Sequence, residues 1–125
     1  NVIYWGKVDY NTGLNLMKHS DLIMAMYYKS NPLHRYAAPN KYYEGLMLGI
    51  PILTTKDTLV GNNTEKYDTG FVIEEGIEQI RKILNLVTTG ELLQIKKQRS
   101  NDVWVNHYKD CIRNFMMNTY KDIIK

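Results

Sequence analysis

The sequence predicts an α/β fold, in which a parallel sheet carries helices on both faces. Four short strand-like segments alternate with segments of helical periodicity, and this alternation is typical of parallel sheets. Residues 22–27 form a continuous apolar run, as expected for a strand that is buried on both faces. A third indication lies at residues 49–55, where a glycine leads into an apolar strand whose first residue is proline.

The first half of the chain supplies two of these strands and two helices. Residues 2–5 are a short apolar run ending at a glycine, which predicts a strand. Residues 10–19 carry leucine and methionine at helical spacing behind a cap-like start. Residues 29–40 follow the strand at 22–27, contain two prolines and are expected to form an irregular loop. A helix is expected over residues 40–48, because the glycine that follows suits the position after a helix.

The second half supplies two more strands and the remaining helices. The expected elements are a strand at 51–55, a helix at 57–67 begun by Asp57, a strand at 71–73, a helix at 76–87 and a helical segment at 91–125 with an irregularity near 100–102. The helix at 76–87 is amphipathic. The apolar face from Val103 to Ile123 is expected to pack on the domain, and a membrane-surface helix is the alternative.

Composition sets the class of protein. The 125 residues make one domain, 1–125, and 44% hydrophobic residues are enough for a core. The net charge of +3 suits anionic small ligands or a membrane surface, but it is too weak and scattered to indicate nucleic acid. Cys111 is the single cysteine, which favours a reducing, cytoplasmic compartment, and we expect it to be a buried small hydrophobe. No cysteine–histidine pattern indicates a metal site, and no apolar run could span a bilayer.

The most informative segment begins at Pro39 and leads into the helix at 40–48. A helix N-terminus offers unpaired amides and a positive dipole end, to which Lys41 would add a charge for a phosphate. Glu44, one turn later, is placed to accept hydrogen bonds from sugar hydroxyls. The alternative is an ordinary surface pair of Lys41 with Glu44, and Asn40 as a simple N-cap.

Further candidate residues surround this segment. Those on or beside the preceding loop, which face a ligand or merely cover the loop, are Tyr27, Tyr28, His34, Arg35 and Tyr36. Thr54 and Thr55 end a strand at the carboxyl edge of the sheet, where α/β proteins bind ligands. Their alternative role is a hydroxyl bonded to nearby backbone. His19 and His107 are expected on the surface.

The order of these motifs resembles the C-terminal, nucleotide-sugar-binding half of GT-B glycosyltransferases, in particular the large retaining family 4. The residues that carry the resemblance are Ser20-Asp21 before an apolar strand, Pro39-Asn40-Lys41-x-x-Glu44, Gly49-Ile50-Pro51-Ile52-Leu53 and Gly70-Phe71-Val72-Ile73. Glu44 matches the second glutamate of the family's Glu-x7-Glu motif, which holds the ribose. Pro39, Asn40 and Lys41 would face the diphosphate and the donor sugar. Tyr36 stands where the family has its first glutamate, so the chain departs from the pattern there.

The resemblance implies a Rossmann-like sheet and a place for this chain in a larger enzyme. It implies transfer of a sugar, with retention, from a nucleotide-sugar to a glycan or lipid-linked acceptor in bacterial cell-surface polysaccharide synthesis, such as capsule or lipopolysaccharide. It implies no metal or cofactor, and a location in the cytoplasm, peripheral at the inner face of the cell membrane. The family's first two strand–helix units and its N-terminal acceptor domain are not in this sequence, so we expect an incomplete domain of a longer polypeptide, inactive in isolation.

Two other classes of function remain open. A nucleotide-sugar epimerase of the same fold would need acid and base residues, and the chain offers no clear carboxylate pair. A degenerate transferase, acting as a non-catalytic partner, is the other, and Tyr36 in place of glutamate is the feature that supports it. A signalling receiver domain is disfavoured, because its acidic cluster would have to stand at Trp5-Gly6 and Thr54-Thr55.

Overall fold

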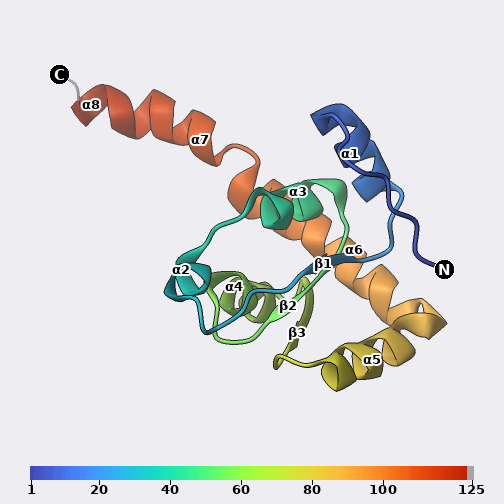
Figure 1. Cartoon of the computed structure of the whole chain (residues 1–125). Coiled ribbons are helices and arrows are strands. Elements are labelled where there is room, and N and C mark those ends of the chain that lie inside the picture. The colour runs from blue at the N-terminus through green and yellow to red at the C-terminus, as the bar shows by residue number, and fades with distance from the viewer. Residues whose placement is uncertain (124–125) are drawn as a thin grey trace.

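A computed structural model describes residues 1–123 and shows an α/β protein built around a small, open, three-stranded parallel sheet (Figure 1). The strands are β1 (Ile23–Ala25), β2 (Ile52–Thr55) and β3 (Gly70–Ile73), in the order β1-β2-β3. The larger helices are α1 (Tyr10–Lys18), α2 (Pro32–Tyr36), α3 (Asn40–Leu48), α4 (Leu59–Tyr67), α5 (Ile77–Leu86) and α6 (Glu91–Val103). The smaller elements are the 3-10 turn η1 (Val87–Thr89), the π-helical η2 (Trp104–Tyr108), α7 (Cys111–Asn114), η3 (Phe115–Tyr120) and α8 (Lys121–Ile123).

Helices cover both faces of the sheet, as the sequence predicts. On one face, α3 and α4 pack their buried Tyr42, Leu46 and Val60 against Ile23 and Ile52 of the strands. On the other face, α5 and the turn after it cover the strand residues Leu53, Phe71 and Ile73. The alternation within β2 produces this division, because successive strand residues point to opposite faces.

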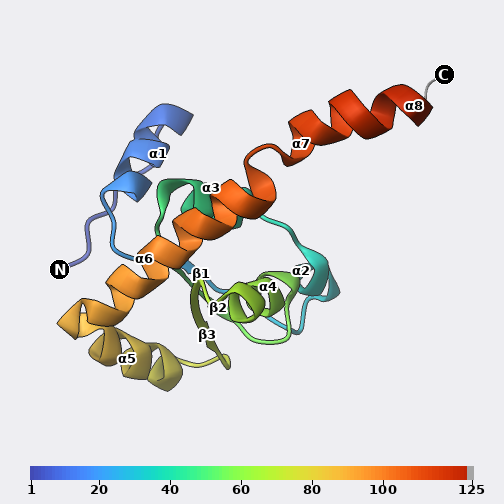
Figure 2. The same cartoon turned by 180° about the vertical axis from the view of Figure 1, so that it is seen from behind.

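Helix α6 lies along the amino edge of the sheet. Its Lys97 pairs with Asp21, just before β1, at 3.0 Å. Its buried Ser100 hydroxyl donates to the carbonyl of Thr69, just before β3, at 3.1 Å. Asp68 also pairs with two basic residues of α6. Figure 2 shows α6 passing across the sheet, with its first turns beside α5 and its last turns beside α3.

The expected helix at 40–48 is confirmed, and its ends explain its length. Gly49 adopts the left-handed conformation, with φ of 67°, and its amide closes on the carbonyls of Gly45 and Leu46. Pro39 is the N-cap and contributes no side-chain hydrogen bond to the helix start. The alternative reading of Asn40 as the N-cap is therefore wrong, because Asn40 is already the first helical residue.

The predicted strand at residues 2–5 is wrong, so the sheet has three strands in the described part of the chain rather than four. Val2 is 99% exposed and Trp5 62% exposed, and no ladder joins this segment to β1. Four apolar residues form a strand only where a neighbour accepts their backbone hydrogen bonds.

Several other boundaries differ from the sequence-based prediction. The strand predicted at 22–27 is confined to β1 at an edge of the sheet, so Met24 is 47% exposed and the strand is not buried on both faces. The expected loop at 29–40 contains the one-turn helix α2, because Asn31 caps it and Pro32 occupies its first position. Thr58, not Asp57, caps α4, since its hydroxyl accepts from the Gly61 amide at 2.9 Å. The irregularity expected near 100–102 falls later, in the π-helical η2, and α6 is regular through those residues.

The apolar face expected to pack on the domain does so at Val103, Trp104 and Tyr108, but the helices after Tyr108 project from the domain (Figure 1). Phe115, Met117 and Ile123 are exposed, and α8 makes its main contacts with η3. Cys111, expected to be buried, is exposed as well, because it begins this projecting segment. Among residues 1–123, no helix combines the length and apolar character that crossing a membrane requires.

Two glycine substitutions test the packing of the sheet. A Cβ at Gly70 would lie 2.1 Å from the Ile52 carbonyl oxygen, so Gly70→Ala must separate β3 from β2. We expect it to lower the free energy of unfolding by about 3 kcal/mol or more.

A Cβ at Gly13, inside α1, would meet only a Val8 methyl at 3.8 Å, and Gly13→Ala should raise the free energy of unfolding by about 0.5–1 kcal/mol.

Urea unfolding followed by circular dichroism measures both variants. Equal stability of Gly70→Ala and the parent protein would contradict the close approach of the two strands.

Candidate functional site

The candidate site centres on Glu44, a half-buried residue of α3 whose carboxylate lies exposed beside α1. The Tyr10 hydroxyl donates a hydrogen bond to Glu44 Oε1 at 2.9 Å, and in the described structure Oε2 has no such partner. This hydrogen bond raises the pKa of the Tyr10 phenol, because ionised tyrosine could no longer donate to the carboxylate. Glu44 is thus held in place while one of its oxygens stays available to a ligand.

Two hollows open on either side of Glu44. The first, which we name the aromatic hollow, has a volume of about 310 Å³ and is lined by Tyr10, Asn40, Tyr43, Glu44, Met47 and Trp104. The second, the Lys41 hollow, has a volume of about 260 Å³ and lies between α1 and the start of α3, with Lys41 and Glu44 among its lining residues. The structure therefore brings Asn40, Lys41 and Glu44 to one region, as the sequence predicts.

The start of α3 leaves polar groups free. The amides of Asn40 and Lys41 have no backbone acceptor in the described structure, and Pro39 offers no side-chain acceptor either. The exposed Lys41 side chain has no ion pair or hydrogen bond to any described residue. Free amides, a positive dipole end and an unpaired lysine together favour an anion.

The other two predicted site residues lie apart from Glu44. Tyr36, on α2, is 79% exposed and lines a separate hollow with Arg35 and Asp57. Thr55, at the end of β2, is fully buried, and its hydroxyl accepts from the Tyr27 amide at 2.9 Å. The Thr55 hydroxyl is therefore bonded to nearby backbone, which is the alternative role that the sequence left open.

The loop residues named from the sequence largely contact one another. The rings of Tyr27 and His34 meet edge to face, with 5.6 Å between centroids, and a His34 nitrogen lies 3.2 Å from the Tyr28 carbonyl oxygen. His19 and His107 are exposed, as expected. Within residues 1–123, no group of three or more histidine, cysteine, aspartate or glutamate side chains is arranged to hold a metal ion.

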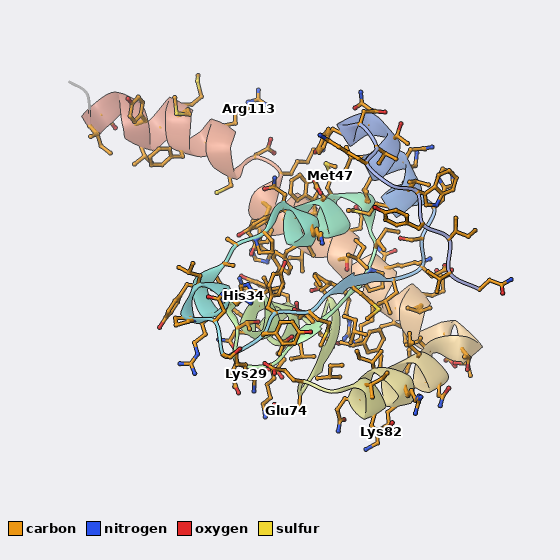
Figure 3. The ribbon with its side chains drawn as sticks, in the orientation of Figure 1. Lys29, His34, Met47, Glu74, Lys82 and Arg113 are labelled. Carbon is orange, nitrogen blue, oxygen red and sulfur yellow. The ribbon has the colours of Figure 1, made fainter. Side chains whose placement is uncertain are left out.

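The carboxyl edge of the sheet carries a charge network that the sequence analysis missed. Lys29 Nζ lies 2.9 Å from Asp57 and 2.7 Å from Glu74, and the Lys29 amide donates to Glu75 at 2.5 Å. Figure 3 shows Lys29 and Glu74 together at this edge, with Met47 of α3 on another side of the molecule. The sequence shows that each of these charged residues follows a strand. It does not show that the strands are neighbours in the sheet, which is what brings the residues together.

This network makes the carboxyl edge a poor site for an anion. Lys29 is paired with two carboxylates, and Lys56 lies 3.8 Å from Glu74. Three carboxylates thus face two lysines, and each lysine is already paired. A pocket of about 290 Å³ beside them is walled by apolar and aromatic side chains, including Tyr28 and Ile77. Lys41 has no such carboxylate partner among the described residues, and neither has Arg35 beside Asp57; the hollow at Lys41 is also lined by the carboxylates of Asp9 and Glu44.

Comparison with known proteins gave no match. No protein-family model matches the chain. No curated protein and no solved structure matches it either.

The charge network predicts a pH-dependent stability. The Lys29 hydrogen bond holds the pKa of the Asp57 carboxyl below its usual 3.8. A lowered folded-state pKa stabilises the fold above the unfolded-state pKa, and this contribution is lost as the pH falls through the folded value. Asp57→Asn, which keeps a residue tolerant of the positive φ of 59°, should lower the melting temperature at neutral pH. The difference from wild type should vanish in acid.

Thermal unfolding across the acid range measures this difference. Glu65→Gln, an equivalent change at an exposed helical carboxylate, should leave the melting temperature unchanged throughout. A gap between Asp57→Asn and wild type that persists far below pH 3.8 would exclude the ion pair as its cause.

Proposed function

We propose that this chain binds the nucleotide-sugar donor of a retaining glycosyltransferase of the GT-B, family 4 type. The observation that carries the proposal is the Glu44 carboxylate, which is accessible and keeps one oxygen without a described partner, one turn after the uncapped start of α3. In this proposal Glu44 accepts hydrogen bonds from the ribose hydroxyls of the nucleotide. Its role is to orient the donor rather than to transfer a proton.

The diphosphate of the donor would lie at the start of α3. The free amides of Asn40 and Lys41 and the unpaired Lys41 ammonium supply positive charge there. When the sugar leaves, negative charge grows on the departing nucleoside diphosphate, and fixed positive groups lower the barrier by stabilising it. Protein groups can provide this stabilisation, so the proposal includes no metal or cofactor.

The remaining parts of the proposal concern the larger enzyme. The acceptor would be a glycan or a lipid-linked saccharide, held by an N-terminal domain of the same polypeptide. The setting would be bacterial cell-surface polysaccharide synthesis in the cytoplasm, at the inner face of the membrane. The exposed apolar side chains of the projecting C-terminal helices, such as Phe115 and Met117, support peripheral association with that membrane.

A degenerate transferase that binds a nucleotide without turnover is the second candidate. The position of Tyr36 favours it, because this residue replaces a glutamate of the family motif and lines a different hollow from Glu44. An epimerase is less well supported. The other carboxylate beside Glu44 is that of Asp9, and it is already bonded to the Thr12 amide and hydroxyl as the N-cap of α1.

The first test is nucleotide binding by Glu44→Gln. This change keeps an acceptor for Tyr10 but removes the charge, so affinity for the preferred nucleotide should fall about 10- to 100-fold. Ligand-observed NMR with UDP, GDP, ADP and CMP measures the affinities. Glu65→Gln is the matched control and should bind as wild type does. Equal binding by wild type and Glu44→Gln would exclude the ribose role.

The second test concerns the phosphate contact. Lys41→Met should weaken binding of the nucleoside diphosphates by about tenfold, and weaken the corresponding nucleosides little, because the lysine acts on the phosphates. Lys82→Met, on α5 and distant from α3 in Figure 3, is the control for loss of one surface charge. A uniform effect on nucleosides and nucleotides would contradict the assignment of Lys41 to the diphosphate.

A further inference from the structure

The aromatic hollow combines aromatic side chains with side chains that form hydrogen bonds. Its walls come from α1, α3 and the π-helical η2, three elements separated in the sequence. Three of its six lining residues are aromatic, and Asn40 and Glu44 add an amide and a carboxylate. Its volume of about 310 Å³ lies at the lower end of the range of about 300–1,000 Å³ found for small-molecule sites.

The aromatic walls are held in place by packing. The ring of Tyr43 is fixed edge to face by Tyr42, at 5.1 Å between centroids, and by Tyr108, at 5.4 Å. Trp104 is half-buried and packs against the core formed by α3, α4 and the sheet. Both rings nevertheless line the hollow, so part of each ring surface faces outward while the rest is fixed by packing.

Trp104 keeps the register of α6, since its amide donates to the Ser100 carbonyl four residues back, and the π-helical turn begins at this residue. The Lys109 amide donates to the Trp104 carbonyl at 2.8 Å, five residues back, rather than to the residue four back as in an α-helix. Such turns insert one extra residue and re-aim side chains, and they are frequent at functional sites. Here the extra residue falls after Trp104, and the indole lines the hollow together with Tyr10 of α1 and Glu44 of α3.

The polar rim consists of groups of complementary kind. Glu44 offers its free carboxylate oxygen as an acceptor, and Asn40 offers both a donor and an acceptor. The Tyr10 hydroxyl, whose side chain is 64% exposed, donates to Glu44 and can accept from a ligand. An apolar face with several hydroxyl groups at its edge matches this lining.

We propose that the aromatic hollow binds a sugar ring of an oligosaccharide. A pyranose has a face of C–H groups, which packs on aromatic rings, and a rim of hydroxyls, which pair with carboxylate and amide groups. Trp104 and Tyr43 form the platform, and Glu44 and Asn40 hold the hydroxyls. This site overlaps the proposed nucleotide site at Glu44, whose one free oxygen serves either a sugar or a ribose at a time, and the inference does not rest on nucleotide binding.

The test is binding of neutral oligosaccharides to the whole chain. Saturation-transfer NMR with linear oligosaccharides of glucose, galactose, mannose and N-acetylglucosamine at millimolar concentration detects the ligand. We expect at least one to bind and to shift the Trp104 indole signal. Trp104→Ala should weaken binding at least tenfold. Trp5→Ala removes an exposed indole outside the hollow and should bind as wild type does.

A second variant keeps the test decisive if Trp104→Ala unfolds. Tyr10→Ala removes a largely exposed ring from the rim and should also weaken binding. Failure of every oligosaccharide to bind the folded protein would overturn the inference, as would equal binding by Tyr10→Ala and wild type. If UDP shifts the Trp104 indole and no oligosaccharide binds, the hollow is a nucleobase site. That result would overturn the inference and leave the proposed function standing.

Discussion

The rest of the structure depends on the contact between α6 and the amino edge of the sheet. This helix joins the segments that enter β1 and β3, through Asp21, Asp68 and the buried Ser100–Thr69 hydrogen bond. A three-stranded sheet with strands of three or four residues has few ladder bonds of its own. By holding the strand entries, α6 keeps the strands in register and leaves the opposite edge, with the loops that follow the strands, free for other contacts.

The charged groups of the molecule differ between the carboxyl edge of the sheet and the start of α3. At the carboxyl edge, where α/β proteins commonly bind ligands, Lys29 forms ion pairs with Asp57 and Glu74. The charge of Lys29 is therefore neutralised by the protein itself. On the α3 side, Lys41 is unpaired and Glu44 has a single partner. Charged groups without full pairing therefore lie between α1 and α3, whereas Lys29 at the edge of the sheet is fully paired.

The helices around Glu44 form one connected unit. Helix α3 contacts α1, α6 and η2, and its Tyr42 and Tyr43 belong to an aromatic cluster with Tyr108. Because the same residues support the core and line the aromatic hollow, the geometry at Glu44 is tied to the packing of the domain. The projecting helices beyond Tyr108 lack such ties, and their apolar side chains remain exposed.

The sequence by itself determined the elements whose signals are local. The helix at 40–48 with its glycine stop follows from periodicity and capping, and so does the grouping of Asn40, Lys41 and Glu44. The strands predicted at 51–55 and 71–73 are present at 52–55 and 70–73. Only the tertiary structure decided the rest. Residues 2–5 have a strand-like composition but no pairing neighbour. The Thr55 hydroxyl accepts a hydrogen bond from the Tyr27 amide. Trp104 and Glu44 line one hollow although sixty positions separate them in the sequence. Pairing, burial and long-range contact depend on partners distant in the chain, and no local pattern records them.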